Sequence, residues 1–411
     1  MKRTALVFVL VLMVVVGVGF WYTPVNVVLD HKTPRGEQGN TAPVKKAARQ
    51  IETVFSLPGD LSIVEKVIAL IRQAQPGSNI YLSYYKIAFP SVLQALEDAH
   101  KKGVRITMVL DDNHENDRIR ERMRTICASD HEQCIHTCSG ACVDPDPRGK
   151  GIMHNKFMLF SHLRDGRRHV VLQSSSNLYP RSSLRFQDAV VVYDDKALYT
   201  RYLDYFHTLY REEGTETHSV YRRPERAVQP LFSPSKAGDD FVQHLLDDVR
   251  CGEQTHIHVA EAYFYDDRKN IAEKLRQLSL SGCDVKVITG VRWKRHHYVS
   301  PGYHVMELLQ HDLVKYQSGL HTKFILIDAF MNGKRKKVVL AGSHNLTRNA
   351  MYLNDETLLY IEDDHVYDRY LDFWHRIERY SSATTQKRTQ KVQAHHREER
   401  ELRDRQKDGT F

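Results

Sequence analysis

Between His321 and Glu356 the chain reads HTKFILIDAFMNGKRKKVVLAGSHNLTRNAMYLNDE, in which two apolar runs are each flanked by polar side chains. His321 and Lys323 stand where the first run begins. Since alternate residues of a strand share one face, this imidazole and this ammonium should point the same way. The second run leads into Gly-Ser-His-Asn345, and the stretch closes on the carboxyl group of Glu356. The pattern predicts a base and a cation side by side on one strand.

An earlier version of this stretch occurs in the first half of the chain. His154-Asn-Lys156 precedes the apolar residues Phe-Met-Leu-Phe, and Ser-Ser-Ser-Asn177 and Asp188 follow. His154 lies 167 residues before His321, while the Asn and the acidic residue lie 168 residues before their counterparts. A fixed offset over this distance indicates an internal duplication. Two related halves should each bring one His, one Lys and one Asn to a shared cleft.

The pattern HxKxxxxD followed by GSxN, present twice, resembles the phospholipase D superfamily of phosphodiesterases. The second copy matches throughout, including Asp328 and Ser343. The first copy keeps Ser175 but departs twice, with Ser161 in place of the family Asp and Ser174 in place of the family Gly. Because the family Asp is mainly structural, Ser161 bears on local stability more than on catalysis.

The resemblance covers roughly residues 50–380, and the order of the predicted elements agrees with it. The first half has strands predicted at 80–85 and 104–110 around a helix at 91–102, and the second half repeats this order from residue 256 to residue 289. Strands that alternate with helices imply a mostly parallel sheet with helices on its faces. We therefore expect an α/β fold of two pseudo-symmetric phospholipase D-like lobes, each a mostly parallel β-sheet flanked by helices, sharing one central active site.

Composition divides the chain into an apolar N-terminus, a polar linker, two lobes with a connector between them, and a charged tail. The predicted boundaries are 1–22, 23–50, 51–213, 214–229, 230–380 and 381–411. The tail is rich in Gln, Lys, Arg and Glu without apolar spacing, so disorder is expected there.

The N-terminus predicts export. Lys2-Arg3 precede an uncharged apolar run from Ala5 to Tyr22, which is typical of a signal peptide or a membrane anchor. A signal peptide is favoured because the run is barely long enough to span a bilayer. We expect a protein that is secreted, or anchored with its catalytic domain outside the cytoplasm. The net charge of +8 suits anionic partners such as phospholipid surfaces or nucleic acid, and we expect a monomer.

An even number of cysteines suits an oxidising compartment. The six are Cys127, Cys134, Cys138, Cys142, Cys251 and Cys283. We expect a Cys251–Cys283 disulfide and two local bridges among the other four. The alternative is a zinc site built from Cys134, Cys138 and Cys142 with His131 or His136, although this spacing is not that of a common zinc motif.

Phosphodiester cleavage needs a nucleophile on phosphorus, a proton for the leaving oxygen, and positive charge around the phosphoryl oxygens. Imidazole can supply the first two near neutral pH. The resemblance implies that His154 attacks to form a phosphohistidine while His321 acts as acid and base. The lysines would hold the phosphoryl oxygens by charge and the asparagines by hydrogen bonds. The predicted catalytic set is His154, Lys156, Asn177, His321, Lys323 and Asn345.

Further residues are expected to support this set. Asp188 and Glu356 would each accept a hydrogen bond from a catalytic histidine and fix its tautomer. Ser175 and Ser343 would hydrogen-bond behind the site, and Asp328 would be structural. A basic, aromatic loop that follows a strand of the second half is expected to contact substrate. Its candidate residues are Arg292, Trp293, Lys294 and His297.

We expect no metal or other cofactor, since the lysines supply the positive charge. The favoured function is a phospholipase D-type phosphodiesterase that hydrolyses phospholipid headgroup esters. The alternative is an exported, sequence-nonspecific endonuclease using the same two histidines. A binding protein without turnover is disfavoured, because both His-Lys-Asn sets are intact.

Overall fold

A computed structural model describes residues 50–127, 134–143, 151–212, 222–236, 238–290, 294–295, 298–299 and 301–380. These residues belong to one compact unit, Arg49–Phe411. The predicted N-terminal segment, the linker up to residue 49 and the tail lie outside the described residues. So do part of the connector and, of the candidate loop, Arg292, Trp293 and His297. None of the described helices is both long and apolar enough to cross a membrane.

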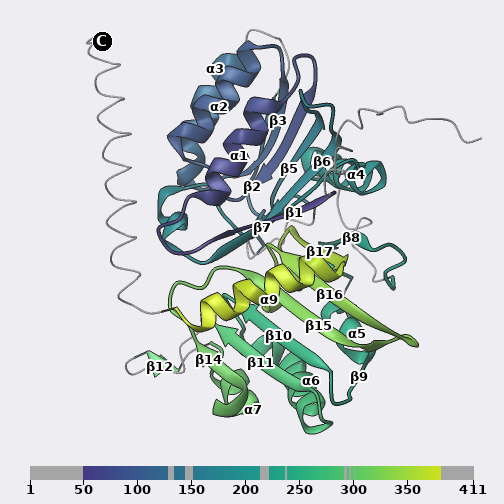
Figure 1. The fold of residues 1–411 in the computed structure, drawn as a ribbon. Helices are drawn as coiled ribbons and strands as arrows, with labels where there is room; N and C mark the ends of the chain where they lie inside the picture. The colour runs from purple at the N-terminus through teal and green to yellow at the C-terminus, as the bar shows by residue number, and fades with distance from the viewer. Residues whose placement is uncertain are drawn as a thin grey trace, which may run out of the picture. The chain divides into compact units, whose positions relative to one another are not determined.

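The first lobe is a sheet with the strand order β1-β7-β6-β5-β2-β3-β4 (Figure 1). Its strands are β1 (Ile51–Ser56), β2 (Asn79–Tyr84), β3 (Arg105–Asp111), β4 (Ile135–Cys138), β5 (Lys156–His162), β6 (Arg168–Ser174) and β7 (Gln187–Val192). Its helices are α1 (Ser62–Gln73), α2 (Pro90–Lys101), α3 (Asp117–Cys127) and α4 (Lys196–Arg211), with short 3-10 turns at His114–Asn116 and Pro180–Leu184.

The second lobe repeats this plan with the strand order β14-β11-β10-β15-β16-β17-β8, and β9 pairs with β15. Its strands are β8 (Val228–Ser233), β9 (Val249–Arg250), β10 (His256–Glu261), β11 (Asp284–Thr289), β14 (Val314–Tyr316), β15 (Lys323–Met331), β16 (Lys334–Gly342) and β17 (Glu356–Glu362), with a separate ribbon of β12 (Lys294–Arg295) and β13 (Tyr298–Val299). Its helices are α5 (Phe241–Asp247), α6 (Lys269–Leu280), α7 (Tyr303–Leu313), α8 (Arg348–Tyr352) and α9 (Asp364–Glu378), with a 3-10 turn at Asp266–Arg268.

The two-lobed α/β fold is confirmed, but the sheets are mixed rather than mostly parallel. In lobe 1 the β2–β3 and β3–β4 pairs are parallel, whereas β5, β6, β7 and β1 pair antiparallel. The cause is the hairpin that follows each HxK strand. In lobe 2 the turn between β15 and β16 is Asn332-Gly333, and both residues have positive φ. Asn-Gly favours tight two-residue hairpin turns in which both central residues have positive φ.

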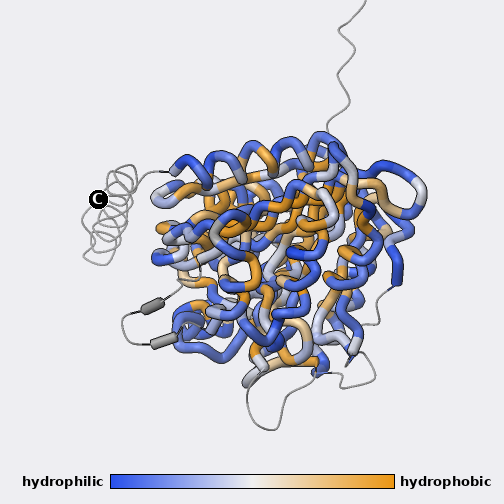
Figure 2. Tube along the Cα trace, turned by 90° about the horizontal axis from the view of Figure 1, so that it is seen from below, coloured by the Kyte–Doolittle hydropathy of each residue, from blue (hydrophilic) through white to orange (hydrophobic). Residues whose placement is uncertain are grey.

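The C-terminal helix of each lobe packs against the first strand of the other. On α9 of lobe 2, Phe373 stacks on Phe55 of β1, with ring centroids 4.5 Å apart. On α4 of lobe 1, Tyr205 stacks on Phe232 of β8 at 4.0 Å. These rings belong to one apolar cluster that draws buried residues from both lobes. Figure 2 shows apolar segments concentrated inside and hydrophilic ones along the outer helices. The two halves therefore share a core.

Two disulfides are formed among the described residues. Cys251 pairs with Cys283 as predicted, and Cys138 pairs locally with Cys142. Cys134 is also disulfide-bonded. Residues 135–138 form the edge strand β4, so Cys138 lies at the end of a strand of the first sheet.

Candidate active site

Main-chain bridges between the lobes place both HxK motifs. The N–H of His154 donates to the carbonyl of Asp355, 3.0 Å away, and the N–H of Asp355 donates to Ile152. The N–H of His321 donates to the carbonyl of Phe186 at 3.1 Å, in the same arrangement with the lobes exchanged. Each predicted catalytic histidine is thus held by the backbone of the opposite lobe.

His154 and Glu356 form a hydrogen-bonded pair across the lobe boundary. Nδ1 of His154 lies 2.8 Å from each carboxylate oxygen of Glu356, which is fully buried. Burial lowers the pKa of His154 to about 4, although the carboxylate opposes this shift. The pKa of Glu356 lies below its usual value: burial raises it, but His154 and Lys156 outweigh burial. The pair is therefore a neutral imidazole that donates Nδ1–H to a carboxylate, which leaves Nε2 as a free base.

The two lysines lie fully buried, and each ammonium donates to the carbonyl of the histidine two residues before it. Burial lowers the pKa of Lys156 well below its usual value and that of Lys323 to about 8. The charge of Lys323 lowers the pKa of His154, and the charge of Lys156 lowers that of His321. The charge of each HxK set therefore acts on the histidine of the other lobe.

The two asparagines keep hydrogen-bonding capacity. Asn177 and Asn345 are 5% and 8% exposed, and their Oδ1 atoms have no partner among the described residues. Nδ1 of His321 is likewise unpaired among those residues. Because unmet buried polar atoms are costly, these three atoms are candidates for contact with a bound ligand. Each Oδ1 atom would accept from a ligand donor, whereas the amide N–H groups could donate to phosphoryl oxygens.

Among the described residues no hydrogen bond joins Asp188 to His321, contrary to the prediction that each acid would accept from a catalytic histidine. Its carboxylate accepts from the Thr322 hydroxyl and from the Tyr370 hydroxyl at 2.8 Å, both on the other lobe. Ser175 accepts from the backbone N–H of Asp188 at 3.0 Å. Asp188 thus joins the lobes instead of orienting an imidazole.

The remaining predicted residues hold the framework. Ser343 accepts from the backbone N–H of Thr357 at 3.0 Å. Asp328 is paired with Arg335 at 2.8 Å. Ser161, in the corresponding place of lobe 1, accepts from the N–H of Asn79 at the start of β2. Lys294 begins β12, and its side chain lies outside the described part of the structure.

Sequence reasoning missed several residues beside the site. Glu261 ends β10 directly across from Lys323, and its charge raises the pKa of that lysine against the effect of burial. In lobe 1 the position across from Lys156 holds the neutral Tyr84. The next residue, Tyr85, places its ring 5.0 Å from that of His154. The available signal was position, since both segments end strands of the parallel part of the sheet.

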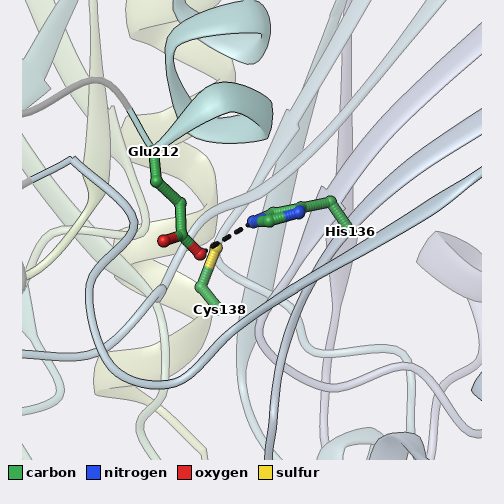
Figure 3. A group of neighbouring side chains, drawn as sticks. All are labelled: His136, Cys138 and Glu212. Carbon is green, nitrogen blue, oxygen red and sulfur yellow. Dashed lines mark hydrogen bonds and ion pairs between the residues drawn. The ribbon is translucent and has the colours of Figure 1, made fainter.

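The alternative zinc site is contradicted. His136, Cys138 and Glu212 do gather, with ligand atoms within 4.8 Å of one another (Figure 3). However, Cys138 is joined to Cys142, so neither sulfur is a free thiolate. His136 is instead paired with Glu212 at 2.9 Å.

Comparisons with known proteins agree with this geometry. The family described as "Cardiolipin synthase, PLD-like domain" matches residues 67–210 and 252–377. No curated protein matches the sequence at a significant level.

Among solved structures, phosphatidylserine synthase from Haemophilus influenzae Rd KW20 is similar with a TM-score of 0.58 and 15% identity, over 80% of this chain and 86% of that one. Polyphosphate kinase from Porphyromonas gingivalis is similar with a TM-score of 0.52 and 15% identity, over 80% of this chain. The match spans half the length of the kinase.

A smaller match is Nuc, a phospholipase D family member from Salmonella typhimurium. It has 19% identity, covers 39% of this chain and 95% of that one, and has a TM-score of 0.30. The matched family segments take in both HxK motifs. The chain belongs to the phospholipase D superfamily, as a protein with two copies of the PLD-like domain.

Proposed function

We propose that this protein hydrolyses phospholipid headgroup esters through a covalent phosphohistidine on His154. The observation that carries the proposal is the pairing of His154 with Glu356 across the lobes, within range of the charges of Lys156 and Lys323. An imidazole with a free Nε2 and a carboxylate behind Nδ1 is built to attack and then to carry positive charge.

The first step transfers the phosphoryl group to the enzyme. Nε2 of His154 forms a bond to phosphorus while the bond from phosphorus to the leaving oxygen breaks. His321 gives its proton to that oxygen, so the headgroup leaves as a neutral alcohol. Glu356 stabilises the imidazolium that develops on His154. In the second step His321 takes a proton from water, the resulting hydroxyl attacks phosphorus, and His154 is released.

Charge on the phosphoryl oxygens is met by buried donors. Lys156 and Lys323 supply positive charge from opposite lobes, and the two asparagines add neutral hydrogen bonds. Preorganised donors of this kind each contribute on the order of 10²–10³ in rate. The scheme needs no metal, so activity should persist in a chelator. If an alcohol replaces water in the second step, the same residues perform transfer instead of hydrolysis.

Support for a lipid comes from the family description and from the fold that the chain shares with a phosphatidylserine synthase. The net charge of +8 suits an anionic membrane surface. We further propose a monomer whose catalytic unit lies outside the cytoplasm, on the basis of the apolar N-terminus and the disulfides.

One observation favours nucleic acid as the second candidate. The ammonium of Lys86 lies 5.4 Å from the ring centroids of both Tyr85 and Tyr179. Since Tyr85 also touches His154, this group borders the site. A cation between two rings repels a choline headgroup, but it suits a second phosphate and a stacked base.

The test uses purified full-length protein, its His154→Ala variant and its Lys86→Ala variant in EDTA. Each is given vesicles of phosphatidylcholine or phosphatidylglycerol and, separately, single-stranded DNA. Headgroup release that is lost in His154→Ala supports the proposal. DNA cleavage without headgroup release, weakened in Lys86→Ala, would replace it with the nuclease. Full loss of activity in EDTA, restored by a divalent ion, would reject the mechanism.

A further inference from the structure

The main-chain bridges show which residues of the two lobes correspond. In lobe 2, Asp355 makes the main-chain bridge to His154, and the residue that follows it is Glu356. In lobe 1, Phe186 makes the main-chain bridge to His321, and the residue that follows it is Gln187. By this criterion a neutral amide occupies the place of the carboxylate that orients His154.

Strand pairing gives the same correspondence independently. Glu356 lies opposite Ser233, the last residue of β8, and Gln187 lies opposite Ser56, the last residue of β1. β1 and β8 are the matching entry strands of the two lobes. The loop before β7 is therefore one residue shorter than the loop before β17. This is hidden in the sequence, because Asp188 follows Asn177 by the same number of residues as Glu356 follows Asn345.

Side-chain contacts between the lobes are a third line of evidence for the same correspondence. The hydroxyl of Thr357 donates to Asn155, the residue after His154, at 2.7 Å. The hydroxyl of Thr322, the residue after the second histidine, donates to Asp188. Asp188 thus corresponds to Thr357, one residue beyond the position of the orienting acid.

Both polar atoms of the Gln187 side chain make hydrogen bonds elsewhere. Its Oε1 accepts from the hydroxyl of Ser176 at 2.7 Å, and its Nε2 donates to the hydroxyl of Ser182 at 2.5 Å. The side chain is 2% exposed. Ser176 immediately precedes Asn177, so Gln187 holds the loop that carries this phosphate-binding amide. It does not reach His321, whose Nδ1 is unpaired within the described residues.

We infer that Gln187 is a positioning residue that fixes the Asn177 loop and leaves His321 without a carboxylate, so that the two histidines are committed to unequal roles. The inference rests on the proposed function and gives a structural reason why the two histidines differ in role. A developing imidazolium is stabilised only at His154, so the covalent bond forms there alone. Burial lowers the pKa of His321 most, and the charges of Lys323, Arg185, Lys156 and His154 lower it further. No carboxylate holds a proton on this imidazole, so once it becomes an imidazolium it gives that proton up readily to a leaving oxygen.

The decisive experiment follows the His321 ring by NMR in protein labelled at histidine, without substrate. The signal is assigned with a His321→Gln variant. In Gln187→Glu a carboxylate enters the place that corresponds to Glu356, and the pKa of His321 should rise by about 1–3 units. In Asp188→Asn, the matched control, it should stay unchanged. A pKa that falls in Asp188→Asn and stays constant in Gln187→Glu would make Asp188 the partner and overturn the inference.

The positioning role is tested by Gln187→Leu, which removes the amide without adding charge. Turnover of whichever substrate the vesicle and DNA assays identify should fall about 10–100-fold, while the pKa of His321 stays at its wild-type value. Ser176→Ala should lower turnover in the same direction, since it removes the contact from the other side. Wild-type turnover in both variants would refute this role. Because the NMR titration uses no substrate, failure of the proposed function would leave its result interpretable.

Discussion

Nδ1 of His154 lies 2.8 Å from the carboxylate of Glu356, a residue of the opposite lobe 202 positions further along the chain. Glu356→Gln keeps the shape but can present an amide N–H to the ring, which favours the wrong tautomer. We expect kcat to fall on the order of 10²–10⁴, with little change in protein stability measured by urea unfolding. Glu362→Gln, on the same strand but paired with Lys336 away from the site, is the control. Equal activity of both variants would contradict an orienting role for Glu356.

Three buried histidines should make stability sensitive to acid. The pKa values of His154, His258 and His344 are each lowered to about 4, chiefly by burial, from an ordinary value of 6.5. Between these values the unfolded chain binds more protons, so stability is complete above pH 6.5 and is lost as the pH falls toward 4. Urea unfolding across this range should show the free energy of unfolding decreasing with acidification.

A variant isolates one of these histidines. His258 packs on Trp374, with ring centroids 4.7 Å apart, away from the catalytic set. His258→Gln should reduce the slope of stability against pH by up to about 1.4 kcal/mol per unit between pH 4 and 6.5. An unaltered slope would show that His258 is already protonated in the folded protein.

Gly342 should be intolerant of a side chain. A Cβ atom there would lie 2.1 Å from the backbone oxygen of Thr357, so the two strands would have to separate. We expect Gly342→Ala to destabilise the protein by about 1–3 kcal/mol or more, measured by chemical unfolding. Gly252→Ala, where nothing lies within 4 Å, should be close to neutral. Similar losses in the two variants would indicate a general effect of replacing glycine instead of a close approach at Gly342.

A buried ion pair should be costly to break from one side. Arg268 is 2% exposed and Nη2 donates to both oxygens of Asp240 at 2.9 and 3.0 Å. Asp240→Asn keeps a good helix cap for α5 but leaves the guanidinium charge uncompensated, so we expect a loss of about 3–5 kcal/mol. Arg223→Gln, which breaks an exposed pair with Asp248, should cost no more than about 1 kcal/mol. Thermal unfolding that ranks the two variants the other way would reject this account.

The duplication made the fold predictable, because matched apolar runs and matched polar residues recur at one offset. The direction of the strands was harder. Alternating strands and helices suggested parallel pairing, while the Asn332-Gly333 turn, a short local signal, sets an antiparallel hairpin after the HxK strand. Local turn chemistry here outweighs the average pattern of the segment.

The sequence supplies a set of candidate site residues, but it does not supply their hydrogen-bond partners. Equal spacing from the asparagines suggested that Asp188 and Glu356 do the same work. Hydrogen-bond partners depend on register, and a loop shortened by one residue moves every following side chain to a new place. Glu261 was missed for a different reason, since its importance comes from the strand beside it, the one that carries Lys323.

Each lobe holds the histidine of the other through a main-chain bridge, and this has a consequence for how the sequences of the two lobes can diverge. If two identical polypeptides met about a twofold axis, any change near one imidazole would be repeated at the other. Within a single polypeptide, the codons for Tyr84 and Glu261, or for Gln187 and Glu356, vary separately. Covalent fusion therefore permits the surroundings of the two imidazoles to differ, as the unequal roles proposed above require.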